Sequence, residues 1–497
     1  GEGVSKRIVE TAVFIMNNYS DSEEIQKLGI EMLEAFVSQE GDMISFLELG
    51  GLDVVLRAMR GGSDMIRCSC SKLLLAAAKN ETVRKAVIQL EGVQMLLTVM
   101  KEHPTHSGIH QYASAALAEL TVDKEVCSLI LEHDGLALLF AAFKRFVAEE
   151  AVEASVTQIL DRLMELSEEA RAPFCKMLPL ETLNTVLANF KKSEAVAYNV
   201  CGILSSLAGE LARKIGRYTV SLLKCIDECM DIHQKSAHAE SHIIRAVAAL
   251  AVDEDCRAFF VKAETYLLIR DLLNDYQEDV VVVGESYKAL LQFSHVEACV
   301  ERLEAVDILT LSSVVLHRYL DEAELVTDLI TFLTVFAAQD EWLEKMGALG
   351  LVNKTVIVMS RHCERRDTVL SGVHLLRAMH RDIIRESFEG SNVVMQLIEC
   401  SGKYLLDLEA LMDILTLLDD MCEFDPERHV LGEVVAFIVK AMRSYSNNKD
   451  LQRVCCVLIA RVSERKENWS SLLKGECVET VIVASVNFME DAAIQHH

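Results

Sequence analysis

The residues of this sequence that come nearest to a chemical site are Cys225, Cys229 and His233, which follow one another at four-residue spacing. On a helix this spacing places the two thiols and the imidazole on one face, where they could bind a metal ion such as Zn²⁺. His362 and Cys363 form a second possible pair. Neither group has the C-x-x-C spacing that is typical of zinc sites, so we interpret the thiols as buried apolar side chains. We expect no metal and no cofactor.

Other residue types that catalyse reactions are not gathered into a recognisable motif. The glycines do not form a phosphate-binding loop after a strand. His374 stands alone, and a lone histidine is more often a packing or surface residue than a base. The pair Asp419-Asp420 is one of many acidic pairs in a chain with 76 Asp and Glu residues. We therefore predict no enzymatic activity and no catalytic residues.

Composition predicts a folded all-α protein. Of the 497 residues, 51% are hydrophobic and only four are proline, the residue that is least compatible with helix interiors. The net charge of −27 argues against nucleic acid as a partner. No run reaches the roughly 18 apolar residues of a membrane span, so we expect no membrane insertion. The fifteen scattered cysteines lack disulfide spacing, which favours a cytoplasmic location.

The dominant feature of the sequence is an internal repeat with a period of about 43 residues. One helical phrase recurs eleven times, for example as IRCSCSKLLLAAA and IHQYASAALAELT. Its central residues are Glu31, Lys72, Ala115, Gln158, Gly202, Arg245, Lys288, Thr331, His374, Asp413 and Val457. Repeats of this length are typical of stacked helical arrays that bury their apolar faces against their neighbours.

A second phrase separates these helices, for example TVRKAVIQLEGVQMLLTVM, and it predicts a short helix, a break at glycine and a longer helix. Three helices per unit with Gly at the break resemble the armadillo repeat family, with HEAT repeats as the alternative. The resemblance implies a right-handed α-solenoid superhelix of about eleven three-helix repeats, forming one domain over residues 1–497. The pattern is weakest at residues 165–230 and 255–275, where the glycine is missing.

The resemblance also implies that the third helix of each unit lines a concave groove. Importin-type members of the family carry ladders of Trp and Asn there, and neither ladder is present in this sequence. A nuclear-import adaptor is therefore disfavoured. Three residues before each central position, eight consecutive copies carry polar or amphipathic side chains, which we interpret as contact with solvent in an open groove. They are Ser69, Tyr112, Ser155, Asn199, His242, Glu285, Asp328 and Ser371.

Basic side chains on this face predict a groove that suits an acidic or phosphorylated segment of a partner protein. The alternative is an ordinary solvated helix face. The predicted groove residues are Tyr112, Arg162, Asn199, His242, Arg245, Lys288 and Gln292.

The same positions become apolar near the C-terminus, at Leu417, Val454 and Val457. These residues predict an apolar interface for a partner or for self-association through the C-terminal repeats. A shifted alignment of the last repeats would produce the same pattern, and the sequence does not decide between the two.

Two functions remain open. The first is a non-catalytic scaffold or adaptor that binds a peptide or protein along its concave groove. The second is an armadillo region that belongs to a larger signalling protein, such as a kinase, a TIR-domain enzyme or a ubiquitin-ligase substrate receptor. There it would restrain the catalytic part or recruit its target.

Overall fold

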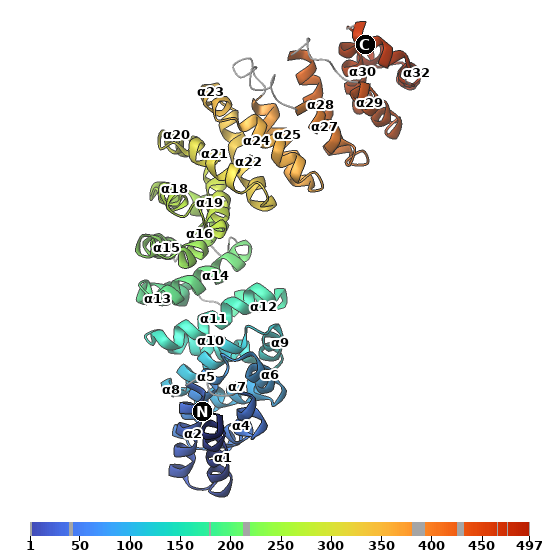
Figure 1. Cartoon of the computed structure of the whole chain (residues 1–497). Helices are drawn as coiled ribbons and strands as arrows, with labels where there is room; N and C mark the ends of the chain where they lie inside the picture. Colours follow the sequence, from blue (N-terminus) through green and yellow to red (C-terminus); the bar gives the residue numbers. More distant parts are fainter. Residues whose placement is uncertain are drawn as a thin grey trace. The chain divides into compact units, whose positions relative to one another are not determined.

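The computed structural model describes residues 2–38, 43–177, 180–211, 219–379, 393–424, 432–464, 466–474 and 476–496. Helices dominate these residues and no strand occurs among them, so the prediction of an all-α solenoid is confirmed (Figure 1). The chain divides into two compact units, Gly1–Thr265 and Tyr266–His497. Each unit is a stack of the same three-helix repeat. That the two units form one continuous solenoid stays a prediction.

Unit 1 contains three sets of helices. The third helices are α2 (Glu23–Ser38), α5 (Asp64–Ala77), α8 (Ser107–Leu120), α11 (Glu150–Leu166), α14 (Glu194–Leu211) and α16 (Ala237–Leu250). The second helices are α1 (Glu2–Asn18), α4 (Gly51–Gly61), α7 (Gly92–Glu102), α10 (Gly135–Arg145), α13 (Leu180–Phe190) and α15 (Thr219–His233). The first helices are α3 (Met43–Glu48), α6 (Glu81–Gln89), α9 (Lys124–Glu132), α12 (Glu168–Met177) and α17 (Glu254–Lys262).

Unit 2 repeats the pattern. Its third helices are α19 (Val280–Phe293), α22 (Ala323–Ala337), α25 (Arg366–Met379), α28 (Leu408–Phe424), α30 (Lys449–Ser463) and the short α33 (Ala492–His496). Its second helices are α18 (Thr265–Asp275), α21 (Ile308–Arg318), α24 (Leu351–Arg361), α27 (Val393–Ser401), α29 (Gly432–Ser444) and α32 (Cys477–Asn487). The remaining helices are α20 (Glu297–Ala305), α23 (Asp340–Ala348), the 3₁₀ turn η3 (Lys466–Asn468) and α31 (Trp469–Lys474).

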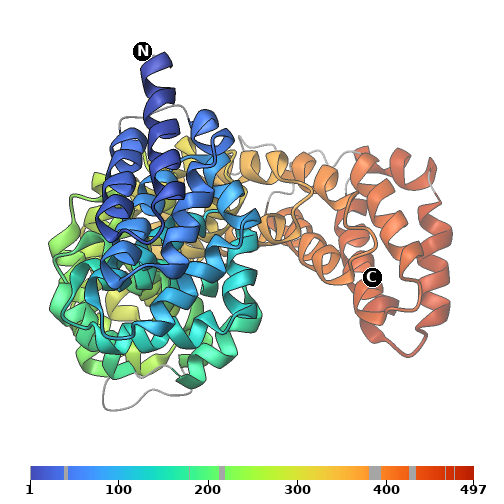
Figure 2. The same cartoon turned by 90° about the horizontal axis from the view of Figure 1, so that it is seen from below.

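Consecutive third helices pack against one another within each unit. In unit 1 the contacts run from α2 through α5, α8, α11 and α14 to α16, and in unit 2 from α19 through α22, α25 and α28 to α30. Figure 2 shows the helices of the C-terminal repeats side by side. Each third helix except the short α33 contains one of the eleven central residues named from the sequence. One face of each third helix is buried against neighbouring helices, and the opposite face is accessible for binding.

Where the described residues include it, the break before the second helix is in several repeats a single residue in the left-handed conformation, and this residue is glycine at Gly50 and Gly350. In the other repeats where it occurs it is acidic, namely Glu91, Asp134, Glu264 and Asp307, with φ between 56° and 61°. The predicted role of the glycines is therefore corrected. Side chains at φ near +60° are uncommon but tolerated at single positions, so the break does not need glycine.

The glycine that follows the break has a different role, which is close packing. A Cβ atom at Gly92 would lie 2.9 Å from the carbonyl oxygen of Val87, and one at Gly135 would lie 2.6 Å from that of Ile130. Both distances are too short for a side chain. The segment 255–275, where the sequence pattern fades, keeps the left-handed residue at Glu264 and simply lacks this glycine.

Most cysteine side chains of the described residues are buried and none forms a disulfide. Burial raises the pKa of Cys229 and of Cys400 to about 12, because an apolar environment disfavours the thiolate. Within the described residues, no single helix has the length and apolar character to cross a membrane. The helices α9 and α10 together have the required length and apolar character, but the chain bends by 88° between them.

Candidate functional site

The third helices α11, α14 and α16 of unit 1 bring aromatic, basic and acidic side chains together on one face. Tyr198 of α14 stacks on His242 of α16, with ring centroids 3.6 Å apart, and on His238, with centroids 4.1 Å apart. Tyr198 and His242 are half-buried and His238 is exposed. Arg162 of α11 and Arg245 of α16 lie close enough to act on both rings: burial lowers the pKa of His242 and the two guanidinium groups add to that shift, whereas burial raises the pKa of Tyr198 and they oppose it. We call these five residues, together with Asp161, the Tyr198 cluster.

Asp161 lies beneath the cluster, in a space that Gly202 leaves open. A Cβ atom at position 202 would overlap the Asp161 carboxylate, so the absence of a side chain there lets α11 and α14 approach with an acidic group between them. Burial raises the pKa of Asp161 to about 7, the negative charge of Glu165 adds to the rise, and Arg162 and Arg245 oppose it.

His242 is neutral at physiological pH. Burial and, to a smaller extent, the nearby guanidinium groups of Arg245 and Arg162 together lower its pKa to about 3. Its buried Nδ1 atom has no hydrogen-bond partner among the described residues. The rings of Tyr198 and His242 therefore form an uncharged stacked pair close to two guanidinium groups. Arg162 is half-exposed and forms an ion pair of 3.0 Å with Glu165, also half-exposed. An exposed ion pair of this kind contributes little to folding stability, so Arg162 can leave Glu165 and pair with an acidic ligand at small cost.

The structure brings together three of the predicted groove residues, Arg162, His242 and Arg245. Tyr112 of α8 is half-buried and lies near Lys72 of α5, away from the interactions of the Tyr198 cluster. Lys72 itself is paired with Glu34 at 2.7 Å.

Asn199 is buried, which differs from the solvent contact expected of it. Its Nδ2 atom donates hydrogen bonds to the Ala154 carbonyl oxygen at 3.0 Å and to Oγ1 of Thr157 at 3.2 Å. The polar side chain is thus explained by bonds between α14 and α11. Glu285, at the same position in unit 2, is also buried.

The remaining predicted groove residues, Lys288 and Gln292, belong to α19 of unit 2. Lys288 is exposed and pairs with Glu285 at 3.4 Å, and Gln292 is half-buried. Along the same face of unit 2, polar side chains bridge consecutive third helices. The bridges are Thr327–Thr368 at 2.6 Å, Thr331–Ser371 at 3.0 Å, His374–Asp413 at 3.2 Å, Arg377–Asp420 at 3.1 Å and Arg461–Asp419 at 3.3 Å. These polar groups are therefore already engaged in hydrogen bonds and ion pairs with one another.

The predicted C-terminal apolar interface contains a misplaced residue. Leu417 has no exposed surface, because it points from α28 into the interior of unit 2, whereas Val454 and Val457 of α30 are half-buried. The burial pattern of α28 matches that of α25 when Thr416 replaces Asp413 as the central residue. The apolar positions in α28 therefore arise from a shifted alignment.

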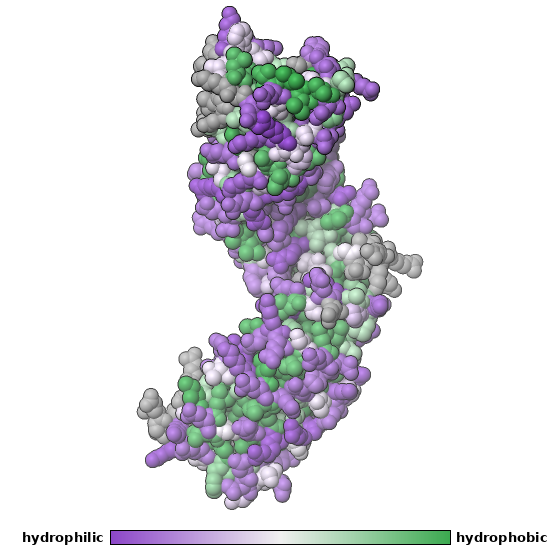
Figure 3. Space-filling view, turned by 90° about the vertical axis from the view of Figure 1, so that its right-hand side faces the viewer, coloured by the Kyte–Doolittle hydropathy of each residue, from purple (hydrophilic) through white to green (hydrophobic). Residues whose placement is uncertain are grey.

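Apolar surface does gather near the C-terminal end of unit 2 (Figure 3). The exposed side chains there lie on α31 and α32, and include Leu473, Val478, Ile482 and Val486.

The possible metal ligands face the backbone of the preceding repeat. The Cys229 thiol and the His233 Nε2 atom both contact the Lys191 carbonyl oxygen, at 3.8 and 2.9 Å, while the Cys225 thiol contacts Oδ1 of Asn184 at 3.7 Å. Among the described residues, no three His, Cys, Asp or Glu side chains are grouped so that they could hold a metal ion.

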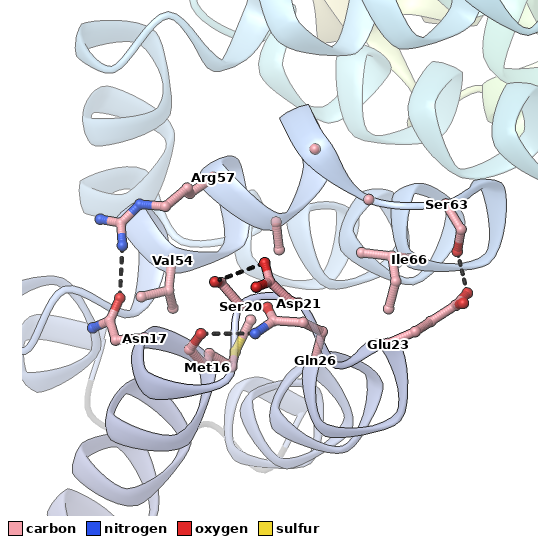
Figure 4. Close-up of a pocket in the computed structure, with 13 residues that line it drawn as sticks. Met16, Asn17, Ser20, Asp21, Glu23, Gln26, Val54, Arg57, Ser63 and Ile66 are labelled. Atoms are coloured by element: carbon pink, nitrogen blue, oxygen red, sulfur yellow. Dashed lines mark hydrogen bonds between the residues drawn. The ribbon is translucent and has the colours of Figure 1, made fainter.

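A cavity of about 540 Å³ lies in the first repeats, at the corner where α1 meets α2 and α4 meets α5 (Figure 4). Its polar groups are largely paired. Arg57 donates to Asn17 at 2.6 Å, Ser63 donates to Glu23, and Gln26 donates to the Met16 carbonyl oxygen at 2.7 Å. Smaller cavities line the same edge of other repeats.

Three members of the Tyr198 cluster are absent from the sequence prediction, namely Tyr198, Asp161 and His238. Tyr198 and Asp161 each come directly before a predicted residue, Asn199 and Arg162. One residue corresponds to a rotation of 100° around a helix, so a small error in the assumed face selects the wrong neighbour. Tyr198 and His238 are aromatic residues at similar positions of consecutive repeats, a signal that a search for aromatic pairs would have found.

Comparison with known proteins reveals similarity of fold. One solved structure, from a study of a conserved phosphorylation switch that controls the interaction between cadherin and β-catenin, aligns with a TM-score of 0.68. The alignment covers 93% of this chain and 97% of the other at 13% identity. Two engineered proteins align over 49% of the chain with 19% and 17% identity and TM-scores of 0.38 and 0.40. No protein-family model matches the sequence, and no curated protein matches it. The first likeness agrees with an armadillo-type solenoid and concerns the fold alone.

Proposed function

We propose that the protein is a non-catalytic scaffold or adaptor that binds an extended acidic or phosphorylated segment of a partner protein on the third-helix face of unit 1. The observation that carries the proposal is the Tyr198 cluster, in which Arg162 and Arg245 lie near the stacked rings of Tyr198 and His242. Guanidinium groups bind carboxylates and phosphates with two parallel hydrogen bonds, and flat uncharged rings accept the backbone or apolar side chains of an extended segment.

The net charge of −27 adds specificity to this arrangement. An acidic segment is repelled by most of the surface and attracted only where basic side chains gather. The structural neighbour from the study of the cadherin and β-catenin interaction, which a phosphorylation switch controls, supports a proposal of this class.

Charge reversal tests the proposal. Arg162→Glu with Arg245→Glu should weaken the binding of acidic and phosphorylated peptides, selected from a peptide library on the parent protein, by about 10- to 100-fold. The matched control is Lys85→Glu with Lys224→Glu, because both side chains are exposed ion-pair partners on α6 and α15 and the change in net charge is the same. Fluorescence anisotropy would measure both variants.

Equal loss of affinity in both double variants would mean that net charge alone governs binding. No loss in the Arg162 and Arg245 variant would place the binding surface elsewhere. Tyr198→Ala provides an independent check, since it removes the central ring and leaves every charge in place. We expect it to lower affinity and to keep the salt dependence of binding unchanged.

A further inference from the structure

In several repeats, one position at the start of the third helix holds a side chain that donates to the preceding helix. In α14, α19, α22, α25 and α28 the same position is apolar. Gln26 donates from Nε2 to the carbonyl oxygen of Met16 at 2.7 Å (Figure 4) and to that of Tyr19 at 3.0 Å. Gln452 makes the same two bonds, with the same lengths, to Met442 and Tyr445. The acceptors are carbonyl groups at the end of the second helix, which have no partner within that helix.

The spacing of these bonds is constant, since the acceptors lie ten and seven residues before the donor. Gln495 follows it too, with bonds to Ser485 at 2.7 Å and Phe488 at 3.4 Å. Arg67 occupies the position in α5 and donates to the Arg60 carbonyl. In α8 it is His110, whose ring nitrogens are buried without a hydrogen-bond partner among the described residues; burial lowers its pKa, and the nearby carbonyl groups of His103 and Met100 oppose that shift.

Glu153 and Glu240 occupy the same position in α11 and α16. The turns that precede them have the same backbone bond as the others, from Glu149 N to the Phe146 oxygen at 2.7 Å and from Ser236 N to the His233 oxygen at 2.8 Å. Both glutamate side chains are completely buried. None of their carboxylate oxygens has a hydrogen-bond partner among the described residues.

A carboxylate cannot do what the glutamines do. An ionised carboxyl group only accepts hydrogen bonds, so it would place lone pairs against the lone pairs of the carbonyl groups. A protonated carboxyl group has one O–H donor and has nearly the shape of the glutamine amide. We propose that Glu153 and Glu240 fold as neutral carboxylic acids, each donating its proton to a carbonyl oxygen of the preceding helix. The acceptor is Phe143 or Phe146 for Glu153, and Met230 or His233 for Glu240.

The electrostatic surroundings agree with this assignment. Burial alone raises the pKa of Glu153 to about 9, and His110 of α8, the titratable group at the neighbouring corner, is kept neutral by burial. Its ring lies 4.8 Å from that of Phe146. Burial also raises the pKa of Glu240 to about 9, and the negative charge of Asp231 on α15 adds to the rise. The other titratable groups around Glu240 are the buried thiols of Cys201 and Cys229.

The two protons make unit 1 sensitive to alkaline pH. The folded pKa lies above the ordinary value of 4.5, so the stabilisation is complete below that value and is lost as the pH rises through about 9. Glu240 lies on α16 beside His242 and Arg245. Loss of its proton therefore weakens the helix that carries half of the Tyr198 cluster.

The test replaces the proton with an amide. Glu153→Gln with Glu240→Gln should leave the melting temperature unchanged near pH 4.5 and raise it by a growing margin between pH 6 and 9, because the amide keeps a donor that cannot ionise. The reciprocal variant, Gln452→Glu in unit 2, should acquire a melting temperature that falls with pH. Infrared difference spectra of the parent against the double Gln variant should show the carbonyl band of protonated carboxyl groups at neutral pH.

Three results would overturn the proposal. They are a parallel pH dependence of the parent and the Gln double variant, absence of the carboxylic-acid band, and a Gln variant that is less stable at every pH. The double variant Glu153→Leu with Glu240→Leu distinguishes the effect of the donated hydrogen bond from the effect of side-chain volume, because leucine fills the space but has no donor. It should be less stable than the Gln variant at every pH, and equal stability would show that no donated hydrogen bond is made. None of these measurements depends on peptide binding.

Discussion

Asp161 is the residue whose charge is expected to change within the neutral range. Its folded pKa of about 7 lies above the ordinary value of 3.8, so the carboxyl group becomes neutral as the pH falls through 7. An acidic ligand then meets Arg162 and Arg245 without a competing anion beneath them. Lowering the pH from 8 to 6 should tighten binding roughly fivefold, the equivalent of about 1 kcal/mol. Anisotropy titrations across this range would measure it.

Asp161→Asn is the matched variant for this prediction. It should bind at pH 8 as the parent binds at pH 6, and its affinity should not vary between the two. A steeper pH dependence in the variant would show that another group titrates at the site.

Single residues were also where prediction from sequence was least accurate. The repeat alignment placed Arg162, His242 and Arg245 on one face, and in the structure both arginines lie near His242, whereas their role in binding stays a prediction. It misread Asn199, because a buried amide that bonds to the next helix looks the same in a sequence as an exposed one. It misread Leu417 because α28 is shifted by three residues relative to the repeat.

At the scale of helices, a glycine in close contact with its neighbours and a glycine with open space beside it lead to opposite predictions for the same substitution. Gly135→Ala places a Cβ atom 2.6 Å from the Ile130 carbonyl oxygen and should lower the free energy of unfolding by about 1–3 kcal/mol. Gly284→Ala, within α19, meets no atom within 4 Å and should raise it by about 0.5–1 kcal/mol through helix propensity. Urea denaturation of both variants measures the difference, and a Gly135→Ala protein as stable as the parent would contradict the packing role.

The helices themselves were predictable because their signals are redundant. Each third helix has an apolar face of several residues, and one wrong assignment does not change the pattern. The breaks were harder, because Glu91, Asp134, Glu264 and Asp307 give no hint in their residue types that the backbone is left-handed there. Nor could the sequence reveal that Glu153 and Glu240 replace a glutamine, since the acceptors are main-chain atoms.

For the whole molecule, the charge of −27 should make folding and binding respond to salt in opposite directions. Raising the ionic strength from low to physiological values screens self-repulsion and should increase the melting temperature. The same change should weaken the binding of acidic peptides to the Tyr198 cluster. Differential scanning calorimetry and anisotropy in the same buffers test both parts, and a melting temperature that falls with salt would show that attractive ion pairs dominate.

The left-handed break has a consequence for how such a chain changes over evolution. Each repeat demands one unusual backbone angle and a stripe of apolar volume, and both requirements accept many residue types, as the mixture of glycine, glutamate and aspartate at the break shows. Mutations can therefore accumulate in every copy without loss of the architecture. A chain under this weak constraint can keep the fold while its sequence changes, and the structural neighbour shares this fold at 13% identity. Backbone geometry is therefore a better guide to this architecture than residue identity.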